Sequence, residues 1–231
     1  MRMLINQNRV TIAFHKGYPI PDDDLENKLK TKGYVVPKEP IVVRIGADGS
    51  QNSAKRWERK GVEVYYIQSK GLLSAEGRDL EKVSECFNEI HEIAKDLLGQ
   101  DLAKETKWAE VFFDCRYLGA KRPLKALEDY LPSQPYLKLG EIVGEKVKPF
   151  SLIIYSAEKS ELEELEVPLK EVPNWVHINI EPLIINSKYY FVRVIYRQED
   201  ISKVGVFNTK LGGVVDSLIS QIESDSDVST E

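Results

Sequence analysis

The residue types that most often do chemistry in proteins are thinly spread along this chain. Its three histidines, His15, His91 and His177, lie far apart, and His91 is followed by a glutamate without the second histidine of a zinc-binding helix motif. Cys86 and Cys115 lack the spacing of metal ligands. A cysteine–histidine pair could still form in space, but no spacing indicates one. The sequence therefore identifies no catalytic residue, leaves open an enzyme of unrecognised class, and predicts no cofactor.

The acidic residues do not form a recognisable metal site either. Asp22, Asp23 and Asp24 do not match a calcium loop, and their position at the start of an expected helix explains them through the helix dipole. Glu110 and Asp114 share one face of an expected strand, but at the usual rise they lie about 13 Å apart, too far to bridge one metal ion. The segment GADGSQNS lacks the lysine of a phosphate-binding loop and is expected to be a turn. We therefore expect no metal.

Charge is distributed unevenly between the two ends of the chain. Residues 1–60 contain 12 Lys/Arg and 7 Asp/Glu, a net charge of +5, so the remaining 171 residues carry −10 of the total of −5. This asymmetry could direct one face toward an anionic partner or hold two copies together, and both interpretations stay open. The negative total argues against a dedicated duplex-DNA protein. No apolar run approaches the ~18 residues of a membrane span, and we expect a cytoplasmic protein.

A short basic run with an aromatic residue inside it offers a possible contact for single-stranded nucleic acid. Its members are Lys55, Arg56, Trp57, Arg59 and Lys60. Open sheets with exposed aromatics stack unpaired bases, and basic side chains follow the phosphates. The alternative is a solvated charged loop without a binding role.

The most distinctive candidate surface is expected on a β-hairpin, with strands near residues 175–181 and 189–196. Period-two alternation places Val176, Ile178 and Ile180 on the core face. The opposite face, with one residue from an earlier strand, gives the candidate binding residues Tyr65, Trp175, His177, Asn179, Phe191 and Arg193. The expected register pairs Glu181 with Tyr189, and hence His177 with Arg193. Either this face is open and binds a partner, or a loop or the acidic insert covers it and these residues are ordinary packing.

The elements that carry these residues fall into two similar series. The first contains strands at 9–16, 41–45 and 62–69, a helix from residue 22 that ends at Gly33, and a helix at 78–98 with Asp79 as N-cap and Gly99 as its end. The second contains strands at 108–118, 137–143 and 150–156, a helix at 123–130, the hairpin, and a helix at 207–222. That last helix has its apolar stripe on Phe207, Leu211, Val215, Leu218 and Ile222. Gly212 and Gly213 interrupt it, and close packing on the sheet is the expected reason.

These two series predict an α+β fold with one extended antiparallel sheet. Each half, 1–106 and 107–222, would contribute strand, helix, strand, strand and helix, and the long helices would pack on one face. An acidic insert at about 157–174 and a disordered acidic tail at 223–231 complete the chain. In topology this outline is similar to the saddle of TATA-binding-protein folds and to helix-grip domains, although no sequence motif of either family is present.

A non-catalytic binding or assembly protein is the leading functional expectation. Aromatic residues at outward strand positions favour it, and a homo-oligomer or another protein is the expected partner. The alternatives are a single-stranded nucleic-acid-binding protein and an enzyme of unrecognised class.

Overall fold

The structure, a computed structural model, describes residues 2–17, 19–45, 51–99, 102–131, 134–157 and 172–224. The strands are β1 (Met3–Phe14), β2 (Ile41–Ile45), β3 (Gln51–Arg59), β4 (Val62–Ile67), β5 (Leu72–Gly77), β6 (Thr106–Leu118), β7 (Leu152–Ala157), β8 (Trp175–Pro182) and β9 (Tyr189–Gln198). The helices in these ranges are α1 (Asp22–Thr31), α2 (Leu80–Leu98), α3 (Leu102–Glu105), α4 (Pro123–Tyr130), α5 (Gln134–Val143) and α7 (Ile201–Ser224). The fold is therefore α+β.

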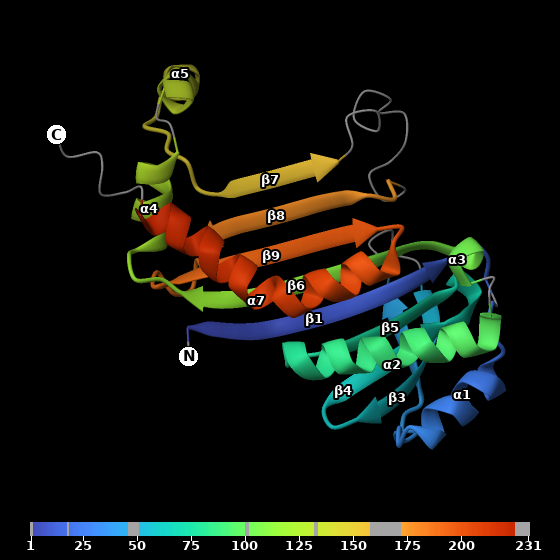
Figure 1. Ribbon diagram of the computed structural model, residues 1–231. Helices are drawn as coiled ribbons and strands as arrows, with labels where there is room; N and C mark the ends of the chain where they lie inside the picture. Colours follow the sequence, from blue (N-terminus) through green and yellow to red (C-terminus); the bar gives the residue numbers. More distant parts are fainter. Residues whose placement is uncertain are drawn as a thin grey trace.

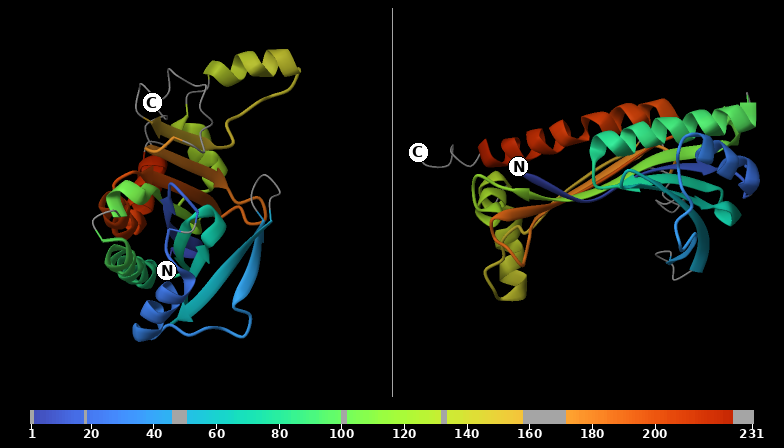
Figure 2. Two further views of the ribbon diagram at one scale, coloured as in Figure 1. Left: turned by 90° about the vertical axis from the view of Figure 1, so that its right-hand side faces the viewer. Right: turned by 90° about the horizontal axis from the view of Figure 1, so that it is seen from below.

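All nine of these strands join one antiparallel sheet in the order β2-β3-β4-β5-β1-β6-β9-β8-β7 (Figure 1). The first strand of each expected half, β1 or β6, lies at the centre of the sheet. α2 contacts β5 and β1, α7 contacts β9 and β6, and the two helices contact each other. Figure 2 shows both helices on the same side of the sheet, whose ends bend away from them. We call the opposite side of the sheet the concave face.

Strand alternation produces the core between the sheet and these helices. Val10 and Ile12 of β1, Val111 and Phe113 of β6, and Val192 of β9 are fully buried on the helix side. The helices contribute side chains at helical spacing, among them Val83, Phe87, Ile90, Val204, Leu211, Val215, Ile219 and Ile222. On the expected core face of the hairpin, Ile178, Ile180, Tyr190, Val192 and Val194 are buried, and Val176 and Tyr196 are partly buried. Arg197 is buried on the opposite face.

Helix α2 begins and ends where local chemistry predicts. The Asp79 side chain accepts hydrogen bonds from the backbone N–H groups of Glu81 and Lys82, both at 3.1 Å. These bonds satisfy two donors that a helix start leaves free, and they lower the pKa of Asp79. At the other end Gly99 has a φ of 61°, which favours glycine. The expected cap and stop are both confirmed.

Two expected elements are wrong and one strand was missed. Residues 137–143 lie in helix α5 instead of a strand; Leu139, Ile142 and Val143 recur at steps of three and four, as on one face of a helix. Residues 51–53 of the expected turn belong to β3, and residues 46–50 lie outside the described residues. β3 is polar, but it is held by pairing on both sides, with β2 and β4. β5 was not expected, although it connects β4 to the centre of the sheet.

The register of the hairpin differs from the expected one by two residues. The structure pairs Glu181 with Phe191, Asn179 with Arg193, and Trp175 with Arg197. The reason is the position of the turn, which is centred one residue later in the chain: Pro182 pairs with Tyr190, and the N–H of Leu183 donates to the carbonyl of Tyr189 at 2.8 Å. Because a shift of two residues returns every side chain to the same face, the membership of the face is unchanged. Its cross-strand neighbours do change, and His177 lies opposite Ile195.

The two glycines of α7 do not pack on the sheet, so that expectation is also wrong. A Cβ on Gly213 would meet nothing within 4 Å, and one on Gly212 would meet only the Leu80 side chain of α2, at 3.5 Å. α7 also begins six residues before the expected start, at Ile201. Most of the expected acidic insert (158–171) and the tail from 225 lie outside the described residues. None of the described helices offers a stretch long and apolar enough to cross a bilayer.

Candidate binding site on the concave face

An arginine–phenylalanine cluster occupies the concave face where the two halves of the sheet meet. Its members are Arg9 of β1, Phe112 of β6, and Phe191 and Arg193 of β9. The guanidinium carbons of Arg9 and Arg193 lie 5.2 and 5.6 Å from the centroid of the Phe112 ring, and that of Arg193 lies 5.3 Å from the Phe191 ring. These distances place two cations around one phenyl ring, within the range of cation–π attraction.

Neither arginine of this cluster has a carboxylate ion pair within the described ranges. Asp114 lies directly opposite Arg193 in the β6–β9 register and is 8% exposed, yet no ion pair joins the two among the residues described. Arg116, exposed on the same strand face, donates to the side-chain oxygen of Asn6 at 3.2 Å instead. The arginine–phenylalanine cluster is thus cationic and aromatic, and Glu110, Asp114 and Glu181 lie on the same face of the second half.

Unsatisfied polar atoms gather on the same side of β7, β8 and β9. The described residues contain ten buried side-chain polar atoms without a hydrogen-bond partner, and half of them lie here: Tyr155 Oη, Trp175 Nε1, His177 Nδ1, Asn179 Oδ1 and Arg193 Nε. Each buried polar atom whose hydrogen bond is left unmade typically lowers the free energy of unfolding by about 1–3 kcal/mol. The Trp175 ring lies 5.9 Å from that of Tyr155 and 6.0 Å from that of His177. This concentration is typical of a surface whose hydrogen bonds a ligand completes.

One buried ion pair fixes the aromatic end of this surface. Arg197 of β9 donates from Nε and Nη2 to one carboxylate oxygen of Glu110, at 2.9 and 2.6 Å, and from Nη1 to the carbonyl of Val172 at 3.2 Å. Its guanidinium lies 4.2 Å from the Trp108 ring and 5.5 Å from the Trp175 ring. Sequence reasoning missed this pair, because it lies across β6 and β9, whose pairing brings Glu110 opposite Arg197 and leaves no local pattern.

Burial and charge both act on His177. Desolvation lowers the pKa of its imidazole, and the positive charge of Arg193 lowers it further. The ring is therefore neutral at neutral pH and offers one donor and one acceptor nitrogen. A neutral imidazole beside an arginine suits hydrogen bonding to a partner, and no carboxylate orients it as a catalytic base would require among the described residues.

The first half of the concave face has the opposite charge. Glu58, Glu63 and Glu76 stand side by side across β3, β4 and β5. With Asp114 they line a hollow of about 930 Å³, whose rim also carries Arg59 and other basic residues. Like charges in adjacent cross-strand positions repel each other, so this row favours a cation. Tyr65 also lies on this side, but it is 7% exposed and its hydroxyl bonds to Glu63.

The basic run of the sequence does not form one patch. Residues 51–59 are strand β3, so successive side chains point to opposite faces, and the expected loop is wrong. Lys55 pairs with Asp22 at 2.7 Å and Trp57 is 1% exposed, both on the helix side. Arg56 lies on the concave side, 3.3 Å from Glu63. The charges expected to meet phosphates are thus divided between two faces and paired internally.

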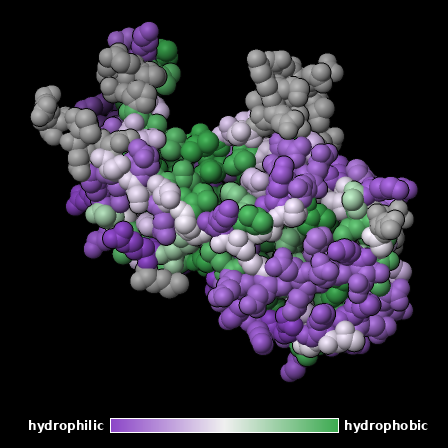
Figure 3. Space-filling view, viewed as in Figure 1, coloured by the Kyte–Doolittle hydropathy of each residue, from purple (hydrophilic) through white to green (hydrophobic). Residues whose placement is uncertain are grey.

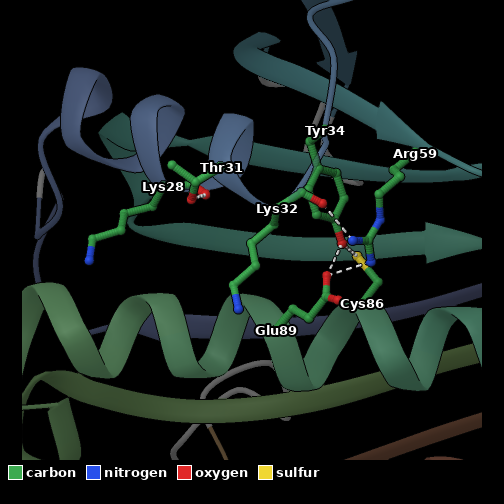
Figure 4. A network of polar contacts seen from close by, with 7 residues as sticks. All are labelled: Lys28, Thr31, Lys32, Tyr34, Arg59, Cys86 and Glu89. Carbon is green, nitrogen blue, oxygen red and sulfur yellow. Dashed lines mark hydrogen bonds and ion pairs between the residues drawn. The ribbon is translucent and has the colours of Figure 1, made fainter.

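Arg59 belongs to a structural network that joins three elements (Figure 4). Its guanidinium bonds to Glu89 of α2 at 2.5 Å and to the carbonyl of Lys32 at 2.7 Å, and it lies 4.4 Å from the Tyr34 ring. The Tyr34 hydroxyl is 2.8 Å from Glu89 and 2.9 Å from the sulfur of Cys86. This network holds the end of α1 and strand β3 onto α2.

The thiols are unsuited to nucleophilic chemistry. Burial raises the pKa of Cys86 to about 11 and that of Cys115 to about 12, and both are free and buried. A thiol in this state is protonated and weakly nucleophilic at neutral pH. Within the described residues, no three histidines, cysteines or carboxylates are grouped to hold a metal ion.

No protein-family model matches this sequence, and a comparison with curated proteins finds no relative. Among solved structures, the chain is similar to the TBP of Methanococcus jannaschii, with a TM-score of 0.34 and 11% sequence identity over 96% of this chain and 99% of that one. A likeness at this level supports no statement about what the chain binds.

Proposed function

We propose that this chain is a non-catalytic binding or assembly protein that holds a polypeptide partner against its concave face. The observation that carries the proposal is the set of five buried, unpartnered polar atoms on β7, β8 and β9. A partner that completes those hydrogen bonds recovers the free energy that they cost in the isolated chain. The cytoplasm as location, the homo-oligomeric state and the lack of a cofactor are parts of the same proposal.

Charge separation across the face supports a polypeptide partner. The arginine–phenylalanine cluster presents Arg9 and Arg193 without carboxylate pairs in the described residues, while β3, β4 and β5 present the glutamate row. A polypeptide can place acidic side chains over one half and basic ones over the other. The rings of Phe112 and Phe191 provide apolar area between the charges, as aromatic residues do at interfaces.

The proposal includes an internal duplication with halves 1–106 and 107–222. Outward from the centre, the sheet carries β1, β5, β4 and β3 on one side and β6, β9, β8 and β7 on the other, with β2 beyond β3 as an additional strand of the first half. In both series the long helix, α2 or α7, follows the strand that lies next to the central one. Equivalent strands would thus have diverged to give the glutamate row in one half and most of the arginine–phenylalanine cluster in the other.

A photo-crosslinking amino acid at position 191 tests the binding face in the cells that make the protein. The matched control places the same group at Val206, which is 53% exposed on α7 on the opposite side of the sheet. One recurring, identified polypeptide that crosslinks from position 191 and not from position 206 is the expected result. Crosslinks from neither position, or equal capture from both, would overturn the proposal. Nucleic acid captured from position 191 would favour the alternative.

Stability measurements separate a binding surface from ordinary core. Phe191 is half-buried, so Phe191→Ala should reduce the free energy of unfolding by less than the ~3–5 kcal/mol lost at a core phenylalanine. A loss in that upper range would mean that Phe191 is core, and the surface hypothesis would be dropped. Arg193→Ala provides the corresponding measurement for the cationic part of the cluster.

The second candidate, a single-stranded nucleic-acid-binding protein, is favoured only by the cations around Phe112. It requires a labelled oligothymidylate to bind with a steep dependence on salt. It also requires Lys55, Arg56 and Arg59 to contribute to that binding. Because each of these side chains is ion-paired within the protein, we expect this test to fail.

A further inference from the structure

Exposed apolar side chains concentrate in one short stretch of the chain. Of the fourteen exposed large hydrophobic residues in the described ranges, five fall between residues 139 and 153: Leu139, Ile142, Val143, Phe150 and Ile153. Ile142 is 80% exposed. Scattered exposed hydrophobics are normal, whereas a cluster of this kind marks an interaction surface.

Helix α5, which carries three of these residues, stands away from the sheet and from α2 and α7 (Figures 1 and 2). It is ten residues long. Helices of this length are marginal in water by themselves and gain their stability from packing an apolar face. Among the described residues, Leu139, Ile142 and Val143 of this helix thus remain exposed, with no apolar surface against which they pack.

At the neighbouring edge of the sheet, apolar side chains of β7 are only partly covered. Leu152 and Ile154 of β7 lie opposite the core residues Ile180 and Ile178, so they face the helix side, yet both are only partly buried. Figure 3 shows hydrophobic surface over β7 and β8 in the space between α5 and α7. β7 is also an edge strand, and its sequence LIIYSA has no charged residue. Edge strands that stay unpaired usually carry charge, proline or a covering element.

We propose that α5 and β7 form the surface through which two copies of this chain associate, the α5 of each copy covering the apolar side of β7 in the other. The inference rests on the self-association included in the proposed function, and it places that contact away from the concave face. In a two-fold dimer, the exposed apolar residues of α5 in each copy can pack on the partly covered side of β7 in the other copy.

Charge fits a second copy. The exposed residues around the apolar cluster carry both signs, with Lys138, Glu141, Glu145 and Lys146. A two-fold axis can therefore set lysines of one copy against glutamates of the other.

Sedimentation equilibrium of the full chain over a micromolar concentration range tests this surface. The variant is Ile142→Glu, and the matched control is Ile184→Glu, at an isoleucine that is 86% exposed in the β8–β9 connection. We expect the wild type and the control to dimerise equally. Ile142→Glu should raise the dissociation constant of the dimer about tenfold or more, because it buries an unpaired charge. Thermal unfolding of the variant, diluted to monomer, should match that of the diluted wild type.

Leu152→Lys provides an independent variant on the helix side of β7, where Leu152 lies opposite Ile180 and is only partly buried, and should weaken the dimer in the same direction. If the dimer persists in both variants, association uses another surface, and this inference fails while self-association stands. A wild-type monomer overturns both. Crosslinking from position 191 reports on the concave face separately, so failure there leaves the dimer result intact.

Discussion

Removing the guanidinium of Arg197 should be one of the most damaging single changes on the concave face. Only 7% of the Arg197 side chain and 13% of the Glu110 side chain are exposed, and the two share contacts of 2.9 and 2.6 Å. Arg197→Met leaves the carboxylate of Glu110 buried without its cation. Breaking a buried pair in this way typically costs about 3–5 kcal/mol. We expect a loss of that size in the free energy of unfolding.

A double-mutant cycle distinguishes the loss of the pair from the loss of packing. Replacing both partners, as Arg197→Met with Glu110→Leu, removes the uncompensated charge, and such replacements are often neutral or stabilising. The double variant should therefore recover most of the loss. The matched control is Lys125→Met, which breaks an exposed pair with Asp129 within α4 and should cost about 0.3–0.5 kcal/mol.

Urea unfolding followed by tryptophan fluorescence gives the free energy of unfolding of the wild type, Arg197→Met, the double variant and the Lys125→Met control. The same experiment reports on the binding face, because the rings of Trp108 and Trp175 lie over the guanidinium. Their emission should shift to the red in Arg197→Met, as the rings lose a fixed neighbour and gain water. A loss below about 1 kcal/mol, or a double variant as unstable as the single one, would refute the reasoning.

Three further predictions follow from single sites. Gly213→Ala should raise the free energy of unfolding by about 1 kcal/mol, since an added Cβ meets nothing within 4 Å. Gly71→Ala should lower it, because φ is +60° there and the added Cβ would clash with the carbonyl oxygen of Lys16. Urea unfolding measures both variants, and a gain in stability at Gly71 would contradict the geometry. With the pKa of Cys86 raised to about 11 and that of Cys115 to about 12, an aromatic disulfide reagent at mildly alkaline pH should modify neither thiol until the protein unfolds, and rapid native-state reaction would be the contrary result. Because burial and Arg193 lower the pKa of His177, the unfolded chain takes up that proton first as pH falls through about 6.5, so the stability from neutral His177 is present above that pH and lost below it. Arg193→Gln should raise the pKa of His177 in an NMR titration while leaving that of His91 unchanged, and an unmoved His177 would count against the contact.

Much of the fold was predictable because it depends on local periodicity. The faces of β8 and β9 follow from alternation, and α2 follows from its apolar stripe and the cap at Asp79. The elements that sequence reasoning missed depend on neighbours instead. β3 is polar and is held by strands on both sides, and α5 is a short segment whose apolar residues were assigned to a strand. The preference of a short segment for a strand depends on packing against its neighbours, which the sequence of that segment does not contain.

The candidate site was predictable in membership but not in arrangement. Trp175, His177, Asn179, Phe191 and Arg193 share one face, as alternation requires. Their neighbours depend on the length of the connection after β8, and a shift of two residues replaces Ile195 by Arg197 opposite Trp175. Arg9 and Phe112 complete the cluster through the pairing of β1 with β6. That pairing brings together residues about a hundred positions apart in the chain. Composition and periodicity cannot predict which distant strands pair.

The same pairing explains why charge is separated across the face. β1 joins the two halves, and its Arg9 stands between Glu76 of β5 and Phe112 of β6 in one cross-strand row. On one side of that arginine the row continues through Glu63 and Glu58, and on the other through Ile195 and His177. A strand of nucleic acid laid along this row would carry its phosphates past three glutamates, at a repulsive cost that its contacts with Arg9 and Arg193 must first offset. A polypeptide can change its charge from one residue to the next. The order of charges along the concave face, as well as the net charge of the chain, therefore supports the proposed protein partner over a polyanion.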